Sequence, residues 1–78
     1  MNDDRFEPVA VQCYAGYRGE EEPRRFHWQG REHLITGIVD RWLDPAHRYF
    51  KVRSDDDHLY ILRHDYRTCQ WTIMPLRQ

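Results

Sequence analysis

Lysine is scarce in this sequence: Lys51 is the one lysine beside eleven arginines. Long apolar stretches are also missing, because no run approaches the roughly 20 apolar residues that a transmembrane helix needs. No window repeats apolar residues at the i, i+3, i+4, i+7 spacing of an amphipathic helix, and the polar N-terminal residues contain no apolar signal-peptide core. We therefore expect a cytoplasmic protein with little helix and no membrane contact.

Clustered metal ligands are lacking as well. Cys13 and Cys69 lie near opposite ends of the chain, whereas structural zinc sites pair ligands about two to four residues apart. The histidines are scattered, at His27, His33, His47, His58 and His64. We expect these histidines on the sheet surface, with no metal site and no cofactor. Both cysteines are expected to be free, buried thiols, since reduced thiols are the default in the cytosol.

Aromatic residues are abundant, and they compensate for the short chain. A chain of 78 residues makes one domain and buries only about 60–65% of its unfolded surface. Each aromatic side chain can bury on the order of 150–250 Å², so a few of them supply a core without metal or disulfide. Residues 1–7 are polar and acidic and are expected to be a disordered N-terminal tail, and residues 8–78 a single β-domain.

Short runs in which arginine alternates with aromatic and aliphatic residues predict strands. Period-two alternation places successive side chains on opposite faces of a sheet. Six strands are expected, at Val9–Ala15, Arg24–Trp28, Arg31–Leu43, His47–Arg53, His58–His64 and Cys69–Met74. Glycines, glutamates and a proline predict a loop from Gly16 to Pro23. The fold class is therefore all-β: about six antiparallel strands in a meander that forms a strongly curled sheet or small open barrel.

Two local signals predict a turn and a bend. Gln29-Gly30 is a two-residue connection suited to a tight hairpin. The alternation breaks near Thr36-Gly37, where a β-bulge at Gly37 would bring Ile35 and Ile38 to one side of the sheet and allow Trp42 to join them. The residues expected in the core are Phe26, Trp28, Ile35, Ile38, Phe50, Val52, Leu59, Ile61, Trp71 and Ile73.

Several runs, taken together, resemble a group of small uncharacterised bacterial domains. These runs are FHWQGREHLI at residues 26–35, Asp40-Arg41-Trp42, Tyr49-Phe50-Lys51-Val52 and Leu59-Tyr60-Ile61-Leu62. In that family a Phe-x-Trp-x-Gly-Arg hairpin precedes a tryptophan strand and two further strands. The resemblance covers residues 24–74 of this chain and implies a compact β-domain. Similar domains are encoded in some bacteria near translesion polymerase genes, which implies a DNA-linked role, but the family assigns no activity to any residue.

Catalysis is not expected. A nucleophilic cysteine needs a histidine and an orienting carboxylate beside it, and no motif places Cys13 or Cys69 in such a group. A domain of this size has little room for both a core and a substrate pocket. The run Asp55-Asp56-Asp57 is expected to be a solvated turn, because it lacks the spaced oxygens of a calcium loop. We expect a non-enzyme with no small-molecule substrate.

Macromolecular recognition is the function that the composition favours. Outward aromatics interleaved with arginine match binding hot spots, so an unknown protein partner or self-association is the first hypothesis. The alternative is binding of single-stranded nucleic acid by an arginine and aromatic sheet face, although a net charge of −1 gives no long-range attraction to phosphate. The side chains expected to form the binding face are Arg25, His27, Tyr49, Lys51, Arg53 and Tyr60.

Overall fold

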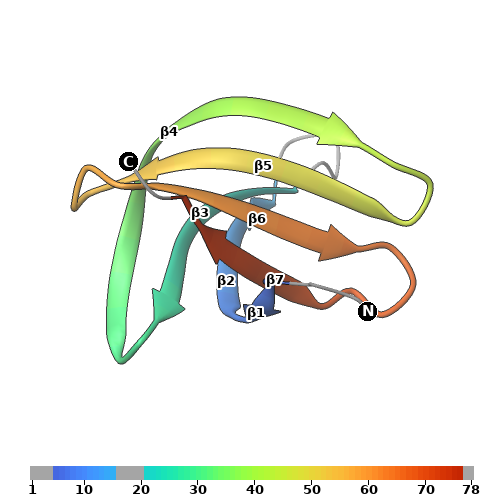
Figure 1. Ribbon diagram of the computed structural model, residues 1–78, viewed down its shortest axis with the longest axis horizontal. Helices are drawn as coiled ribbons and strands as arrows, with labels where there is room; N and C mark the ends of the chain where they lie inside the picture. The colour runs from blue at the N-terminus through green and yellow to red at the C-terminus, as the bar shows by residue number, and fades with distance from the viewer. Residues whose placement is uncertain (1–4, 16–20, 77–78) are drawn as a thin grey trace.

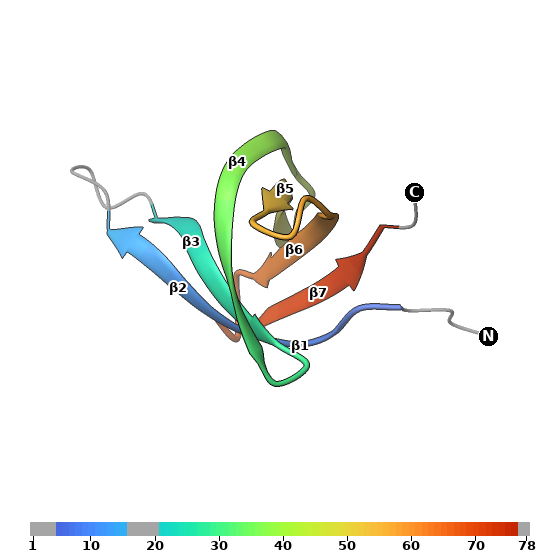
Figure 2. The same ribbon diagram turned by 90° about the vertical axis from the view of Figure 1, so that its left-hand side faces the viewer.

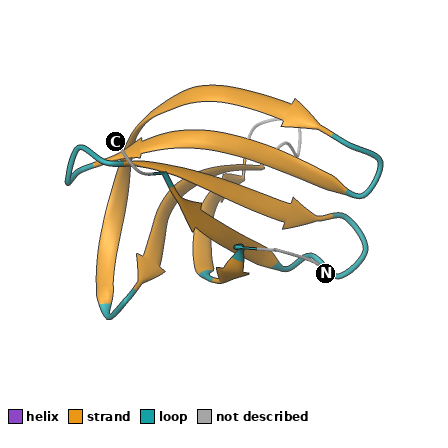
Figure 3. Cartoon of the chain, viewed as in Figure 1, coloured by secondary structure: helices purple, strands orange, loops and turns teal. Residues whose placement is uncertain are grey.

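The computed structural model describes residues 5–15 and 21–76, and within them every regular element is a β-strand (Figures 1 and 3). The strands are β1 (Glu7–Pro8), β2 (Ala10–Ala15), β3 (Glu21–Trp28), β4 (Arg31–Leu43), β5 (His47–Ser54), β6 (Leu59–Asp65) and β7 (Trp71–Pro75). They form an antiparallel sheet in the order β1-β7-β6-β5-β4-β3-β2. In this part of the chain no helix has the length and apolar character to cross a membrane. The expected all-β fold is confirmed.

Strand β1 almost closes the sheet into a barrel. From β2 to β7 each strand pairs with the next, whereas β1 returns to β7 and places Glu7 opposite Ile73. Just after β1, the N–H of Val9 donates to the carbonyl of Trp71 (3.2 Å), near the point where β2 and β7 meet (Figure 2). Strand structure thus begins within the tail expected at residues 1–7, of which residues 1–4 lie outside the described part.

Strand β4 bends because two register shifts divide it. Its first half pairs with β3 and its second half with β5. The pairing with β5 skips one residue between Ile35 and Gly37 and another between Ile38 and Asp40. An extra residue in one strand of a pair bends that strand, and Figure 2 shows β4 as a strongly curved ribbon. The bulge predicted at Gly37 is confirmed. The second register shift, between Ile38 and Asp40, is not predicted from the sequence.

The core lies inside this curl and agrees with most of the predicted set. The buried apolar residues are Phe26, Trp28, Phe50, Val52, Tyr60, Leu62 and Ile73. Ile35, Ile38 and Trp71 are partly buried and pack against them, so the bulge does bring Ile35 and Ile38 to the core side. Trp42 does not join them and lies at the surface.

The predicted orientation of β6 is wrong. Tyr60 and Leu62 are buried, whereas Leu59 and Ile61 are only partly covered. All four of these residues have large apolar side chains, so alternation could not decide which face is inward. The register decides it, because Leu62 pairs with Phe50 on β5, a core residue.

Pro23 lies in a strand rather than in the expected loop. It pairs with Cys13 at the point where the register of β2 shifts between Gln12 and Cys13. Proline cannot donate to a strand ladder and is tolerated at bulges, which explains its place in β3. The Pro23 side chain is fully buried. Glu21 and Glu22, also expected in the loop, belong to β3 as well, and residues 16–20 lie outside the described residues.

The two cysteines are free thiols, as expected, but they are not both buried. Cys13 is half-buried on β2, and Cys69 is exposed. Cys69 has a positive φ of 60° in the turn between β6 and β7, where its N–H donates to the carbonyl of Asp65 (2.9 Å). Cys69 is exposed because it lies in this turn and not in the strand that was expected to begin there.

Gly30→Ala is expected to lower the free energy of unfolding by about 1 kcal/mol. Gln29 and Gly30 have positive φ values of 54° and 75°, which suit a type I′ turn and confirm the predicted hairpin. A Cβ at Gly30 would meet no atom within 4 Å, so the loss comes from backbone strain. Urea denaturation followed by tryptophan fluorescence measures it.

Gly37→Ala is the matched control for this variant. A Cβ at Gly37 also meets no atom within 4 Å, but the φ of Gly37 lies outside the left-handed region. Replacing glycine where the backbone suits any residue leaves stability unchanged or raises it slightly, because the unfolded chain becomes less flexible. Equal losses in the two variants would contradict the assignment of the strain to the Gln29-Gly30 turn.

Candidate functional site

Three of the predicted binding residues share one face of β5. Tyr49, Lys51 and Arg53 alternate with the buried residues Phe50 and Val52. Alternate residues of a strand point to opposite faces, so the three project away from the core, as predicted. Arg53 lies beside Asp57, with 3.2 Å between the guanidinium and the carboxylate.

Tyr60 is not available for binding, and its predicted outward orientation is wrong. It is 6% exposed, and its ring packs edge-on against Phe26 with 5.1 Å between centroids. Its hydroxyl donates to the Asp56 carboxylate (3.0 Å). Burial, together with the hydrogen bond to Asp56 and its negative charge, raises the pKa of Tyr60. The residue therefore belongs to the polar end of the core.

Arg25 and His27 lie on a different part of the sheet from the β5 residues. Their partners Leu34 and Glu32 belong to the first half of β4, whereas the β5 residues pair with its second half. Arg25 also forms an ion pair with Glu32 (3.2 Å). Because β4 bends between its halves, the six predicted residues do not form one continuous binding face.

Two of the exposed apolar side chains lie next to each other in the sequence at the end of β4. Leu43 is 70% exposed, Trp42 is 38% exposed, and Val39 is exposed earlier on the same strand. A cavity of about 370 Å³ lies beside them, and its lining residues are Glu22, Arg41, Trp42, Leu43, Arg48, Tyr49 and Phe50. We call the surface formed by Arg41, Trp42, Leu43, Arg48 and Tyr49 the Trp42 surface.

An aromatic stack forms one side of the Trp42 surface. The rings of Trp42 and Tyr49 are nearly parallel, with 5.3 Å between centroids. The Tyr49 hydroxyl donates to the Asp44 carboxylate (2.7 Å), and Phe6 contacts the Tyr49 ring edge-on (6.3 Å). Burial and the neighbouring Asp44 raise the pKa of Tyr49. Tyr49 is thus held in place by its neighbours, and Trp42 is the exposed ring of the stack.

Two arginines form the other side of the Trp42 surface. Arg41 and Leu43 pair with Phe50 and Arg48, so these four side chains lie on the core side of the sheet, beyond the buried part of the core. The Arg48 guanidinium lies over the Phe50 ring (5.3 Å to the centroid). Arg41 forms an ion pair with Glu22 at the start of β3 (2.8 Å). The cavity is therefore bordered by cations that aromatic and acidic partners hold in position.

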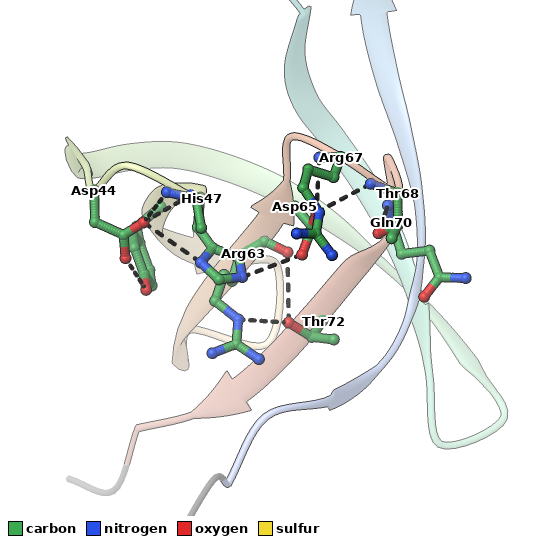
Figure 4. A network of polar contacts seen from close by, with 10 residues as sticks. Asp44, His47, Arg63, Asp65, Arg67, Thr68, Gln70 and Thr72 are labelled. Atoms are coloured by element: carbon green, nitrogen blue, oxygen red, sulfur yellow. Dashed lines mark hydrogen bonds and ion pairs between the residues drawn. The ribbon is translucent and has the colours of Figure 1, made fainter.

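A histidine joins the two turns nearest to the Trp42 surface (Figure 4). His47 Nδ1 lies 3.4 Å from Asp44, and His47 Nε2 lies 3.4 Å from Asp65. Asp44 belongs to the turn after β4 and Asp65 to the end of β6. The same Asp44 carboxylate accepts the N–H of Ala46 (2.8 Å) and binds Tyr49. The aromatic stack is thus connected to the turn that follows β6.

Both aspartates in this network are stabilised in their ionised form. The hydrogen bond from Tyr49 is the largest influence on Asp44 and lowers the pKa of that carboxyl group. Asp65 accepts the N–H groups of Thr68 (3.0 Å) and Arg67 (2.7 Å). These backbone hydrogen bonds lower the pKa of Asp65. Acid should therefore weaken the turns that support the Trp42 surface.

Sequence reasoning missed the exposure of Trp42 and Leu43. The alternation of the sequence allows Trp42 a place in the core and indicates nothing about Leu43 except that it ends a strand. The available signal is their position directly before the Asp44-Pro45 turn, where a strand end has few neighbours to cover it. Hydrophobicity alone does not distinguish such a strand end from a core segment.

A second group of polar side chains lies at the other end of β5. His33, expected on the sheet surface, is instead 5% exposed and stacks on Phe26 with 4.8 Å between ring centroids. Its Nδ1 faces Oδ2 of Asp56 at 3.5 Å. Ligand atoms of His33, Asp55 and Asp56 all lie within 4.8 Å of one another. Within the described ranges these three residues are close enough together to hold a metal ion.

Comparison with models of protein families, with curated proteins and with solved structures finds no significant match to this chain. Any functional proposal therefore rests on the contacts and exposure of the residues at the Trp42 surface and in the cluster of His33, Asp55 and Asp56.

Asp65→Asn is expected to flatten the acid side of the stability profile. The pKa of Asp65 is lower in the folded protein than in the unfolded chain. Its ionised form therefore stabilises the fold at pH values above the ordinary aspartate pKa of about 4. That stability is lost as the pH falls below this value. The wild type should lose stability more steeply than Asp65→Asn between about pH 5 and pH 2, and urea unfolding at each pH measures the difference.

The control for this experiment is Asp57→Asn. This substitution removes a carboxylate that is 87% exposed. The Asp57 carboxylate lies outside the Asp44–His47–Asp65 network. Parallel profiles for the wild type and Asp65→Asn would show that Asp65 does not stabilise the turn through its charge.

Proposed function

We propose that this protein is a non-catalytic recognition module that binds a protein partner through the Trp42 surface. The observation that carries the proposal is the 70% exposure of Leu43 next to Trp42 and a cavity of about 370 Å³. Removing apolar surface from water is favourable, and apolar patches beside a hollow are typical of binding sites. A partner would gain binding free energy both by covering Leu43 and by filling the cavity.

The residue types at this surface support protein binding. Tryptophan, tyrosine and arginine are enriched among the residues that dominate binding energy. Trp42 and Tyr49, from the outward face of the sheet, and Arg48, from its core side, all line the cavity. Tyr49 is already held by Asp44, so less side-chain freedom is lost on binding. Among the described residues that line the cavity there is no cysteine, serine or histidine, so the lining offers no cysteine or serine nucleophile with a histidine base.

The lining also indicates the chemistry of the partner. The apolar surfaces of Trp42, Leu43 and Phe50 favour an inserted aliphatic or aromatic side chain. Arg48 borders the same cavity and favours a neighbouring carboxylate. A segment that carries an apolar residue beside Asp or Glu would satisfy both requirements, and such a segment could belong to another protein or to a second copy of this one.

Leu43→Ser is expected to weaken binding about tenfold, because an apolar hot-spot side chain contributes more than about 1 kcal/mol. Ligands would be obtained from a random peptide display library selected on the wild-type protein. Fluorescence anisotropy would then give the dissociation constants of the enriched peptides for each variant. We expect the enriched peptides to combine apolar and acidic residues.

Leu34→Ser is the matched control. Leu34 is also an exposed leucine of β4, but it lies in the first half of the strand, on the other side of the bend. We expect it to bind the peptides as the wild type does. Peptides that bind Leu43→Ser as well as the wild type, or a library that yields no binder, would argue against a protein interface here.

Binding of single-stranded nucleic acid is the second candidate, and the Trp42–Tyr49 stack favours it. Bases stack on exposed aromatic rings with about 1–3 kcal/mol each. Lys51 and Arg63 lie on the same face as Tyr49, because Arg63 pairs with Tyr49 and Lys51 is two residues further along β5. The resemblance to domains encoded near translesion polymerase genes supports the same candidate.

Lys51→Glu is expected to weaken the binding of a mixed-sequence oligodeoxynucleotide at low salt. Loss of one phosphate contact should also reduce the slope of log K against log salt by about 1. Quenching of tryptophan fluorescence follows the titration. Arg25→Glu changes the net charge by the same amount on the other half of the sheet and serves as control. Equal losses in both variants would indicate attraction by net charge alone, and no quenching in the wild type would remove this candidate.

A further inference from the structure

We propose that His33, Asp55 and Asp56 form a binding site for a divalent transition-metal ion, with zinc as the best match. The three residues lie where the first half of β4 passes the turn after β5. This place is separate from the Trp42 surface, at the other end of β5. The inference does not depend on the proposed function.

His33 is the residue that points to a ligand. Its side chain is 6% exposed and is fixed between the Phe26 ring, on which it stacks, and the edge of Tyr60. Among the described residues none forms a hydrogen bond with His33 Nδ1. A buried polar atom without a hydrogen-bond partner is unfavourable and calls for an explanation. A metal ion between His33 and the acidic turn would supply the missing partner.

The spacing of the three side chains suits one ion. His33 Nδ1 and Asp56 Oδ2 are 3.5 Å apart, and Asp55 offers an oxygen within 4.8 Å of both. Two ligand atoms that are each about 2.1 Å from a tetrahedral zinc ion lie about 3.4 Å from each other. Imidazole nitrogen with carboxylate oxygen suits zinc and related transition metals, whereas calcium and magnesium take oxygen ligands.

The Asp56 carboxylate is already oriented by other groups. It accepts the Ser54 hydroxyl, the N–H of His58 (3.1 Å) and the Tyr60 hydroxyl (3.0 Å). Hydrogen bonds of this kind around a ligating carboxylate fix its direction and strengthen metal binding. The exposed ring of His58 has its Nδ1 3.2 Å from Asp56 Oδ2, which gives the solvent side of the site a second imidazole.

Arg31 competes with the ion for the same carboxylates. Its guanidinium nitrogens lie 3.5 Å from Asp55 and 3.8 Å from Asp56, and its side chain is half-exposed and can leave. A bound cation would have to displace it, because two cations cannot share these oxygens without repulsion. Removal of Arg31 should therefore strengthen metal binding, which a purely structural role of the aspartates would not predict.

Calorimetric titration of the full chain with Zn²⁺ tests the site through two pairs of variants. Asp55→Asn is expected to weaken zinc binding at least about tenfold, and Asp57→Asn, in the same turn but outside the cluster, should bind as the wild type does. Arg31→Gln is expected to tighten binding several-fold. Arg25→Gln removes the same charge from the face of the sheet opposite to His33 and should leave the affinity unchanged. Asp55 lies at the surface, so its variant is expected to keep the fold.

Histidine-selective NMR distinguishes this site from the exposed histidines and the two thiols. Zinc is expected to move the Nδ1 resonance of His33 at one equivalent. The proposal is overturned if zinc leaves that resonance unchanged, if Asp55→Asn and Asp57→Asn bind equally, or if the wild type binds no zinc.

Discussion

The bend in β4 is the constraint on which the rest of the structure depends. A straight strand of 13 residues would span about 40 Å, more than the 36 Å length of the molecule. The strand does not run straight, because the register shifts after Ile35 and after Ile38 bend it. Each half of β4 then pairs with a different neighbour. The sheet consequently curls around Phe26, Phe50 and Leu62, and β1 can reach β7.

Both candidate sites follow from the same bend. The second half of β4 extends beyond the core and carries Trp42 and Leu43 into solvent, where the Asp44 turn supports them. The first half carries His33 inward, onto the Phe26 ring and towards the turn that contains Asp56. The proposed recognition surface and the proposed metal site thus lie at opposite ends of β4.

Alternation in the sequence predicted the strands whose two faces differ in polarity. Phe50 and Val52 could be assigned to the core because charged or polar residues separate them. The same rule failed on β6, where both faces are apolar, and at Pro23, which a bulge accommodates within a strand. The candidate sites were harder to predict, since the contact between His33 and Asp56 depends on the order and curvature of the strands. No local motif records that contact.

The distribution of acidic residues favours protein recognition over nucleic-acid binding. Three arginines that are free to face solvent lie beside carboxylates, in the pairs Arg25–Glu32, Arg41–Glu22 and Arg53–Asp57. Exposed ion pairs of this kind add little stability, but they offset the positive charge that would attract phosphate. The apolar side chains of Trp42 and Leu43 have no comparable compensation within the described part of the chain. A nucleic acid would therefore depend on stacking and on Lys51, whereas a protein partner gains from covering the exposed apolar surface itself.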